Sequence, residues 1–401
     1  MSVVDFDAIV VGVGFGGIYM CKRLVDQVLS VKVIEAALML EEPGIGTGIQ
    51  AQCRVQQRDK AASWDEGKAR WTVLLSESGS KLTSRCLVTA VGLLSEHNYP
   101  DIPGLMTFEG EIYHTGSWPA SYNFKNKNAG VIGNGSTVVQ VITALADNVQ
   151  RLVSFQRHPQ YVVPAGDGEA KDCMFGFEFE ESTIPTFSFR PEERQRIFEE
   201  VWKKGSGFNF MFGTFCDIFY NEDSNKEAQN FIKSKIREKV KDPVKAEKLL
   251  PKDYVDVVNI KGNSITEITP RGIRTQDGIE WELDAIFFAT GFDAVDGNYK
   301  RMSITGPQGS LADTWSEGPE SYLGISVHEF PNLFMILGLN GPFTNLPPTI
   351  ETQVEFISDL ISQANNCLKQ SAIEAESSAV EQWSKTCDKL SANSLFRKTD
   401  S

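Results

Sequence analysis

Residues 6–17 read FDAIVVGVGFGG, and residues 31–35 read VKVIE. The run 6–12 is short and apolar, which is typical of a buried strand, and a glycine-rich turn follows it. An apolar-periodic stretch then extends to about Val28 and predicts a helix. Because VKVIE predicts a second strand, these segments together predict one βαβ unit at the start of the chain.

The glycines of this turn fit the GxGxxG pattern of dinucleotide-binding proteins, in the strand–turn–helix context that the pattern requires. Gly12 permits the tight turn, Gly14 lets the backbone approach a pyrophosphate, and Gly17 allows close packing of the helix on the strand. The helix N-terminus supplies N–H groups and a positive dipole end for the phosphates. Glu35 ends the second strand, where a carboxylate accepts hydrogen bonds from a ribose diol. An acid there favours an unphosphorylated ribose, and therefore FAD or NAD over NADP.

A second glycine turn follows the predicted strand 129–133 (AGVIG) and opens a predicted helix from about Ser136. Gly133 and Gly135 occupy the first two glycine positions of the pattern, but Val138 occupies the third. We expect the valine to push the helix and the strand apart, or to force a different approach of the pyrophosphate. The turn therefore predicts a second dinucleotide site, at Gly133, Gly135 and Ser136, whose affinity stays open.

Arg157 follows the next predicted strand, 151–156, at the point where the first unit has an acid. An arginine there suits the 2′-phosphate of NADP, and the alternative is a surface arginine on a degenerate unit. Two dinucleotide units, the first acidic and the second basic at the ribose position, imply FAD plus NADPH. Hydride can then pass from the nicotinamide to the flavin.

The composition argues against several other classes of protein. The 401 residues include 53 acidic and 39 basic side chains, for a formal net charge of −14, which argues against nucleic acid or an anionic membrane as a partner. The seven cysteines are scattered without a CxxC pair, which favours a reducing compartment over a disulfide framework or a metal site. No apolar run approaches the ~18 residues of a membrane span, and Asp5 and Asp7 interrupt the N-terminal apolar stretch, unlike a signal peptide. We therefore expect a cytoplasmic protein that acts on a small molecule, with its oligomeric state left open.

The segment between the two glycine turns carries a family resemblance. Residues 108–119 read FEGEIYHTGSWP and match the pattern FxGxxxHxxxW(P/D) at Phe108, Gly110, His114, Trp118 and Pro119. This stretch resembles the fingerprint of the type I Baeyer–Villiger monooxygenases, class B flavoproteins related to the flavin-containing monooxygenases. In that family the motif is largely a hinge between domains. The resemblance therefore does not make His114 an acid or a base.

Shorter stretches resemble the same family. Residues 155–159 (FQRHP) are similar to its FQRTP segment, whose arginine and threonine contact the NADP phosphate, although a histidine replaces the threonine here. Residues 289–293 (ATGFD) resemble the segment that returns the chain to the FAD domain. A last stretch is similar to the flavin-facing C-terminal segment of the family and consists of Asn340, Gly341 and Pro342 followed by residues 343–353 (FTNLPPTIETQ).

The resemblance implies both a fold and a reaction. The implied fold class is α/β, with two Rossmann-like dinucleotide-binding domains, one for FAD and one for NADP. The FAD domain would be discontinuous, at 1–118 and 288–401, and the NADP domain would span 119–287 with a helical insertion at about 190–250. The implied reaction is oxygen insertion into a ketone by way of a C4a-peroxyflavin, giving an ester or a lactone.

Two stretches of the family pattern are absent from this chain. After Ala37 the chain lacks an aromatic stretch and the elements that follow it in the family. After Tyr254 the family has a segment whose arginine stabilises the flavin peroxide, whereas Val255 follows at once here. No residue can be nominated for that arginine, so the catalytic residues stay unassigned. Three hypotheses remain open: a ketone monooxygenase, a shortened and catalytically impaired FAD-binding flavoprotein that is inert or NADPH oxidase-like, and a product that does not fold stably.

Overall fold

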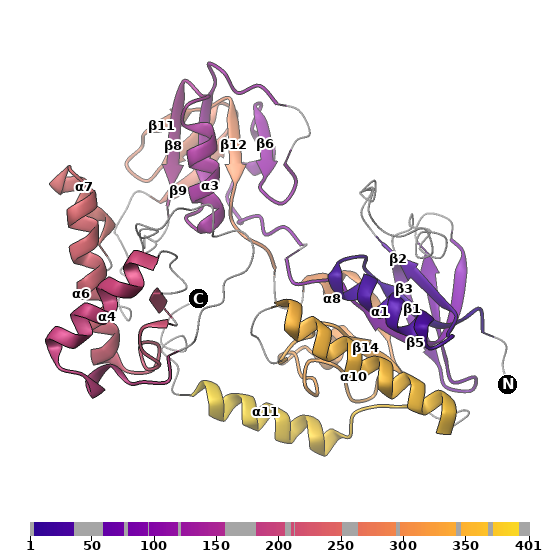
Figure 1. Cartoon of the computed structure of the whole chain (residues 1–401). Coiled ribbons are helices and arrows are strands. Elements are labelled where there is room, and N and C mark those ends of the chain that lie inside the picture. The colour runs from indigo at the N-terminus through magenta and orange to yellow at the C-terminus, as the bar shows by residue number, and fades with distance from the viewer. Residues whose placement is uncertain are drawn as a thin grey trace. The chain divides into compact units, whose positions relative to one another are not determined.

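The computed structural model divides the chain into two compact units (Figure 1). The first unit comprises Met1–Asn98 and Gly291–Asp388, and the second comprises Tyr99–Thr290 and Lys389–Ser401. Each unit is built around its own parallel strands. The structure describes residues 4–35, 59–75, 79–94, 96–118, 122–156, 182–204, 210–211, 213–250, 264–293, 297–341, 346–367 and 372–392.

The sheet of the first unit combines parallel and antiparallel strands. Its described strands lie in the order β13-β3-β4-β5-β1-β2, and β14 pairs with β5. β1 runs parallel to β2 and β5, while β3, β4 and β5 form an antiparallel extension. These pairings confirm the predicted βαβ unit. The strands span Phe6–Val11 (β1), Val31–Ile34 (β2), Asp59–Asp65 (β3), Arg70–Leu75 (β4), Lys81–Thr89 (β5), Ser303–Thr305 (β13) and Leu333–Met335 (β14).

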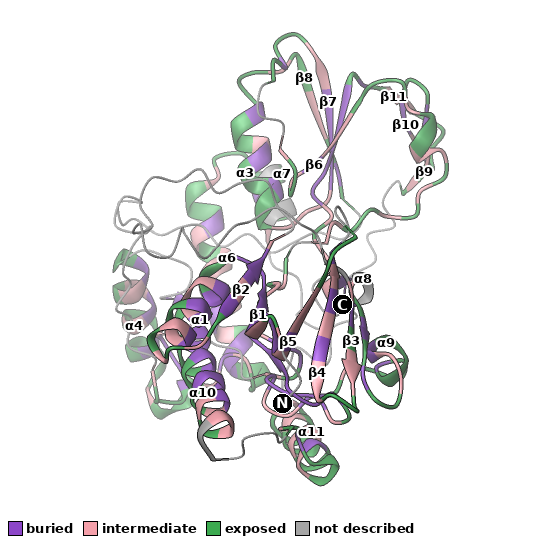
Figure 2. Cartoon of the chain, turned by 90° about the vertical axis from the view of Figure 1, so that its right-hand side faces the viewer, coloured by how far each residue is buried: buried purple, intermediate pink, exposed green. Residues whose placement is uncertain are grey.

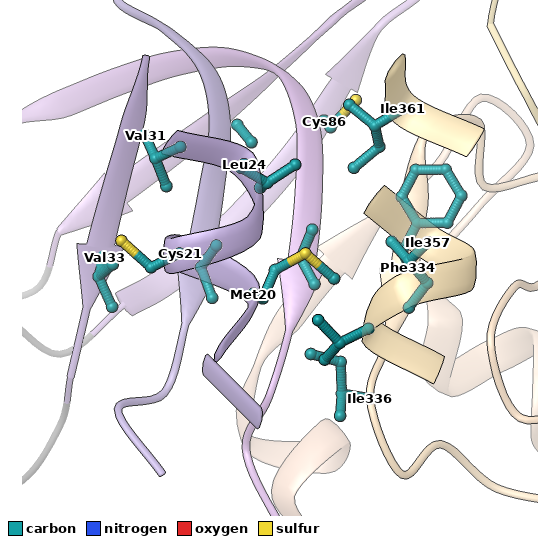
Figure 3. Close-up of a cluster of buried hydrophobic side chains, with 14 of the residues drawn as sticks. Met20, Cys21, Leu24, Val31, Val33, Cys86, Phe334, Ile336, Ile357 and Ile361 are labelled. Carbon is teal, nitrogen blue, oxygen red and sulfur yellow. The ribbon is translucent and has the colours of Figure 1, made fainter. Parts of the chain in front are cut away.

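The apolar core of the first unit lies on both faces of this sheet, because successive side chains of a strand point to opposite faces. Ala8 and Val10 of β1 enter one cluster, and Ile9 and Val11 enter the other. The first cluster lies under α1 (Phe15–Asp26) and α10 (Leu346–Cys367). Figure 3 shows side chains of α1 beside those of β2, and side chains of α10 beside Phe334 of β14. The second cluster includes side chains of α8 (Gly297–Arg301) and α9 (Leu311–Thr314). Figure 2 shows the buried sides of α1 and α10 in purple.

The second unit contains a parallel sheet with the strand order β6-β12-β7-β8. α3 (Ser136–Leu145) connects β7 to β8, which is the second βαβ unit that the sequence predicts. A separate antiparallel sheet has the order β11-β10-β9. The elements span Leu105–Thr107 (η1), Glu111–His114 (β6), Asn128–Ile132 (β7), Arg151–Phe155 (β8), Ile265–Thr269 (β9), Gly272–Thr275 (β10), Glu280–Glu282 (β11) and Ala285–Phe288 (β12).

The helices that the sequence predicts at about 190–250 are present in the second unit. They are α4 (Pro191–Lys204), α6 (Glu222–Lys239) and α7 (Pro243–Leu249), preceded by the 3₁₀ turn η3 (Thr186–Ser188). An aromatic cluster holds α4 and α6 together, with Phe198, Trp202, Phe210, Phe215 and Phe231 all buried. Among the described residues, no helix is both long enough and apolar enough to cross a bilayer.

The division into units differs from the predicted domains at residues 99–118. The sequence pattern placed these residues in the FAD domain, whereas β6 pairs with β12 inside the sheet of the second unit. The second unit also retains residues 288–290, because β12 ends at Phe288. The last described helix, α11 (Ser377–Ser391), begins in the first unit, whose second segment ends at Asp388. The pairing of β6 with β12 therefore places residues 99–118 in the second unit. The order of motifs along the chain does not reveal this pairing.

Candidate functional site

The first glycine turn joins β1 to α1 with no room for side chains at two of its glycines. Gly12 has a φ of +105°, and a β-carbon there would lie 2.2 Å from the carbonyl oxygen of Ala90. A β-carbon on Gly17 would lie 1.9 Å from the carbonyl oxygen of Gly12. Around Gly14, by contrast, a β-carbon would meet nothing within 4 Å. The turn is therefore closed toward the protein and open in front of Gly14.

The N-terminus of α1 is arranged to receive an anion. Gly14 is its N-cap residue, and no side chain in the described part of the chain caps the first turn. That turn also carries no acidic residue. Its backbone N–H groups and the positive end of the helix dipole are therefore available to a negatively charged group. A pyrophosphate fits this chemistry.

Glu35 directly follows β2 and reaches the glycine turn. Its Oε2 accepts a hydrogen bond of 2.7 Å from the backbone N–H of Val13. This bond holds the carboxylate beside the turn, between Gly12 and Gly14 in sequence. The structure thus brings the acid and the three glycines together, and the donor and acceptor set fits the adenosine diphosphate half of a dinucleotide.

The second glycine turn joins β7 to α3 and repeats the first geometry at its start. Gly133 has a φ of +125°, and a β-carbon there would lie 2.3 Å from the carbonyl oxygen of Ala289. A β-carbon on Gly135, the N-cap residue of α3, would meet nothing within 4 Å. Ser136 opens α3 and is exposed. This turn therefore also leaves a helix N-terminus open to a phosphate group.

The two turns differ at the third glycine position, where α3 has Val138. Since a β-carbon at Gly17 would overlap the carbonyl of Gly12, α3 must follow a different path from α1. The N–H of Val138 donates to the carbonyl of Gly135 at 3.0 Å, a bond of the 3₁₀ type, whereas the N–H of Ile18 donates to the carbonyl of Gly14, also at 3.0 Å, as in an α-helix. The first turn of α3 is thus tighter than the first turn of α1. The side chain of Val138 is only 1% exposed and fills the space between α3 and the sheet.

His114 lies at the end of β6 in the second unit, and it is buried. Its Nδ1 accepts a hydrogen bond of 3.0 Å from the backbone N–H of Gly116. The ring also packs against Tyr99, with 5.1 Å between the ring centroids. These contacts fix the path of the chain after β6, which is a structural use of the histidine.

The other described residues of the fingerprint also make packing contacts. Trp118 stacks on Phe287 of β12, with 5.3 Å between the ring centroids. A β-carbon on Gly110 would lie 2.5 Å from the ring of Phe108 and 2.6 Å from the carbonyl oxygen of Asp284, so a side chain has no space there. The fingerprint therefore anchors the chain to the edge of the second sheet.

The segment 337–341 follows β14 and carries two of the predicted flavin-facing residues. Asn340 is exposed and has a φ of +58°. Its Nδ2 donates to the carbonyl oxygen of Pro319 at 2.9 Å. Gly341 packs on Gly324, where a β-carbon would lie 2.5 Å from the Cα of Gly341. Two side chains bond this segment, those of Gln353 and Trp383. Gln353 is the last residue of the stretch that resembles the flavin-facing segment of the family, whereas sequence reasoning missed Trp383.

Three predicted site residues lie outside the described part of the chain. They are Pro119 of the fingerprint, Arg157 of the second ribose position and Pro342 of the flavin-facing segment. The junction after Tyr254 also falls outside it. The predictions for these residues therefore stay predictions, and no catalytic residue is assigned.

Comparison with known proteins covers almost the entire chain. No family model matches it. The chain is 41% identical to cyclohexanone 1,2-monooxygenase of Acinetobacter sp., over 99% of this chain and 89% of that protein. It is 39% identical, with the same shares covered, to a Baeyer–Villiger monooxygenase of Pseudooceanicola batsensis.

The chain belongs to the Baeyer–Villiger monooxygenase family. Solved structures agree with this assignment. Cyclohexanone monooxygenase from Rhodococcus sp. Phi1, bound to NADP⁺, matches with a TM-score of 0.88 at 39% identity, over 99% of this chain and 91% of that one. A complex of OTEMO with FAD and NADP matches with a TM-score of 0.89 at 28% identity, over 100% and 93%. The predicted fold class is confirmed, and this Baeyer–Villiger family member is a flavin-dependent monooxygenase with FAD and NADPH as cofactors.

This Baeyer–Villiger chain is shorter than its relatives within the aligned region. The alignment with the Acinetobacter enzyme spans 488 positions, whereas this chain has 401 residues. At least 87 aligned positions, the difference between these lengths, therefore face gaps in this chain. The chain thus lacks internal segments that its relative has.

Proposed function

We propose that this chain inserts one oxygen atom of O₂ beside the carbonyl carbon of a ketone, giving an ester or a lactone. The observation that carries the proposal is the 41% identity to cyclohexanone 1,2-monooxygenase across 99% of the chain. In the balanced reaction, ketone, O₂, NADPH and a proton give the ester or lactone, NADP⁺ and water. The second oxygen atom leaves as water, and NADPH supplies the two electrons.

In this proposal the first unit holds FAD. The N-terminus of α1 and the turn at Gly12, Gly14 and Gly17 bind the pyrophosphate, and the carboxylate of Glu35 accepts hydrogen bonds from the ribose. Asn340, Gly341 and Pro342 face the flavin end. Bound FAD supplies hydride acceptance and oxygen activation. The protein's own part is to bind the cofactor, to orient it and to exclude water from it.

The second unit holds NADPH in the same proposal. The N-terminus of α3, with Gly133, Gly135 and Ser136, binds the pyrophosphate. Arg157 pairs with the 2′-phosphate, which distinguishes NADPH from NADH. Support comes from the open space at Gly135 and from the missing side-chain cap in the described first turn of α3.

A second candidate reaction is oxygen transfer to a ring nitrogen. It is favoured by a relative named phenazine N-monooxygenase PhzNO1, from Lysobacter antibioticus, which is 40% identical over 94% of this chain and 76% of that protein. The chemistry differs at the oxygen acceptor, because a nitrogen lone pair takes the place of a carbonyl carbon. The substrate test below therefore includes both classes.

The cysteines support a proposed cytoplasmic location. In the described part of the chain, Cys86 and Cys216 are free thiols. Free thiols persist in a reducing compartment and tend to be oxidised outside it.

The test uses the purified full chain loaded with FAD. NADPH added without oxygen should bleach the visible flavin absorbance. Cyclohexanone in aerated buffer should then give its lactone, with about one lactone formed per NADPH consumed, as the balanced reaction requires. A phenazine in place of the ketone tests the second candidate through formation of an N-oxide. NADPH consumption that yields hydrogen peroxide and neither product would contradict both candidates.

A further inference from the structure

The segment Leu337–Gly341, called the β14 turn here, has a strained backbone. Leu337 and Asn340 have φ values of +57° and +58°, in the left-handed region that disfavours residues with a β-carbon. The turn starts just after β14, which ends at Met335. Strain of this kind persists only where surrounding groups over-determine the backbone, and it clusters at binding sites.

Gln353 of α10 holds the first part of the β14 turn. Its Oε1 accepts a hydrogen bond of 2.8 Å from the N–H of Leu337, one of the two strained residues. The side chain is only 4% exposed. Its Nε2 lies 3.4 Å from the position that a β-carbon on Gly341 would take, and it has no hydrogen-bond partner in the part of the chain that the structure describes. Since burying an amide is costly, its presence here is explained by the bond it makes to the turn.

Trp383 of α11 holds the last part of the same turn. Its indole Nε1–H donates to the carbonyl oxygen of Asn340 at 2.8 Å. The side chain of Asn340 is in turn bonded to Pro319. The second strained residue is thus held through its backbone by one helix and through its amide by another segment. A tryptophan in a helix otherwise rich in polar residues is used here for its N–H.

We propose that Gln353 and Trp383 are positioning residues that keep the β14 turn in the conformation that receives FAD. They act through Leu337 and Asn340 and not by touching the cofactor. A turn held in its binding conformation beforehand does not lose conformational entropy when the ligand binds, so affinity rises. The inference rests on the proposed function, because it takes Asn340 and Gly341 as cofactor-facing.

The test compares Trp383→Phe and Gln353→Met with wild type. Each variant keeps the approximate bulk of the side chain and removes its hydrogen bond to the turn. Trp64→Phe is the matched control, since the Trp64 indole lies in the same unit and donates to Glu66 at 2.7 Å, not to the turn. FAD is titrated into full-length apoprotein, and its fluorescence quenching gives the Kd. We expect the Kd to rise about 3- to 10-fold for each turn variant, the effect of one lost hydrogen bond, and to stay unchanged for Trp64→Phe.

A second measurement separates positioning from a purely structural role. The visible absorption band of bound FAD should shift in both turn variants and not in Trp64→Phe. If the turn variants bind FAD as wild type does and only lower the apoprotein Tm, the inference is overturned. Trp383→Phe retains an aromatic ring and decides the matter alone if Gln353→Met fails to fold. Wild-type protein that does not bind FAD would instead contradict the proposed function.

Discussion

The two glycine turns begin with the same geometry and then solve helix packing in opposite ways. Gly12 and Gly133 both have positive φ. A β-carbon on Gly12 would overlap the carbonyl oxygen of Ala90, and a β-carbon on Gly133 would overlap that of Ala289. The first turn then uses a third glycine, so that α1 lies within contact of the backbone of β1. The second turn uses a buried valine that fills the space between α3 and its sheet.

The difference shows that a glycine turn with an open helix N-terminus does not require one packing arrangement behind it. What the turns share is a bare N-cap glycine with open space in front of it, at Gly14 and Gly135. The turns differ where the helix packs on the protein. The first turn requires that Gly17 has no side chain, whereas in the second turn the side chain of Val138 fills the space. Adding side-chain atoms is therefore expected to disrupt the first turn, whereas removing them is expected to destabilise the second.

The largest effect is expected when the third glycine of the first turn is replaced by valine, the residue that the second turn has at that position. Gly17→Val would place a β-carbon 1.9 Å from the backbone oxygen of Gly12, which cannot move aside as a side chain can. We expect loss of bound FAD and a fall of about 3 kcal/mol in the free energy of unfolding, at the upper end for overpacking. Urea unfolding and the flavin content of the purified protein measure the two effects. A variant with normal flavin content would show that α1 can adopt the path of α3.

The reciprocal control shortens the valine of the second turn. Val138→Ala removes two buried methyl groups, so we expect a loss of about 2 kcal/mol in the free energy of unfolding. The flavin content should stay normal, because Val138 packs among Val131, Phe287 and Ala289 of the second unit. Loss of flavin in this variant would remove the distinction between the two turns.

An intermediate effect on FAD binding is expected from a change of Glu35, the acid that bonds the first turn. Glu35→Gln keeps an oxygen for the N–H of Val13 and removes the negative charge. We expect the Kd for FAD to rise about tenfold, since a hydrogen bond to a charged group is worth about 1.5 kcal/mol or more. Fluorescence titration measures this Kd, with Glu66→Gln as a control acid in the same unit. A change below about twofold would mean that the carboxylate only stabilises the turn.

The smallest expected effect is a loss of stability at alkaline pH in the unit that contains the first turn. Burial raises the pKa of the Cys86 thiol from 9.0 to about 12 and the pKa of the Tyr299 hydroxyl from 10.0 to about 12. Both groups are therefore neutral in the folded state where the unfolded chain ionises. Their contribution to stability is fully present below pH 9 for Cys86 and below pH 10 for Tyr299, and it is lost as the pH rises toward 12.

Cys86→Ala tests this pH dependence. At pH 10 the pH is about one unit above the pKa of the thiol in the unfolded chain. Because of Cys86, the free energy of unfolding of the wild type should therefore be about 1 kcal/mol lower than at pH 8. The variant should lose correspondingly less between these two pH values. Urea unfolding at each pH gives both free energies, and equal losses in wild type and variant would argue against a role for this thiol.

Part of the fold and site could be predicted because it depends on local patterns. A strand, a glycine turn, a helix and an acid follow one another within residues 6–35, and their geometry depends on neighbours in sequence. The same holds for the second turn at Gly133 and Gly135 and for the helices near 190–250. The path of α3 at Val138 could not be predicted, because two responses to the valine were open.

Long-range pairing lay beyond the sequence pattern. The fingerprint stands between the glycine turns in sequence, yet β6 joins β12, which comes much later in the chain. Gln353 and Trp383 likewise meet the β14 turn from two separate helices. Trp383 belongs to no motif that would have identified it, and the resemblance that includes Gln353 does not show which backbone group it bonds.

The sequence by itself determined the two glycine turns and the family to which the chain is related. Both rest on short motifs whose backbone conformation follows from glycine and from the strands beside it. The tertiary structure alone decided where the two units divide, how the valine turn packs, and which side chains hold Leu337 and Asn340. These features arise from contacts between segments that are distant in sequence, and such contacts form only when the sheets and helices assemble.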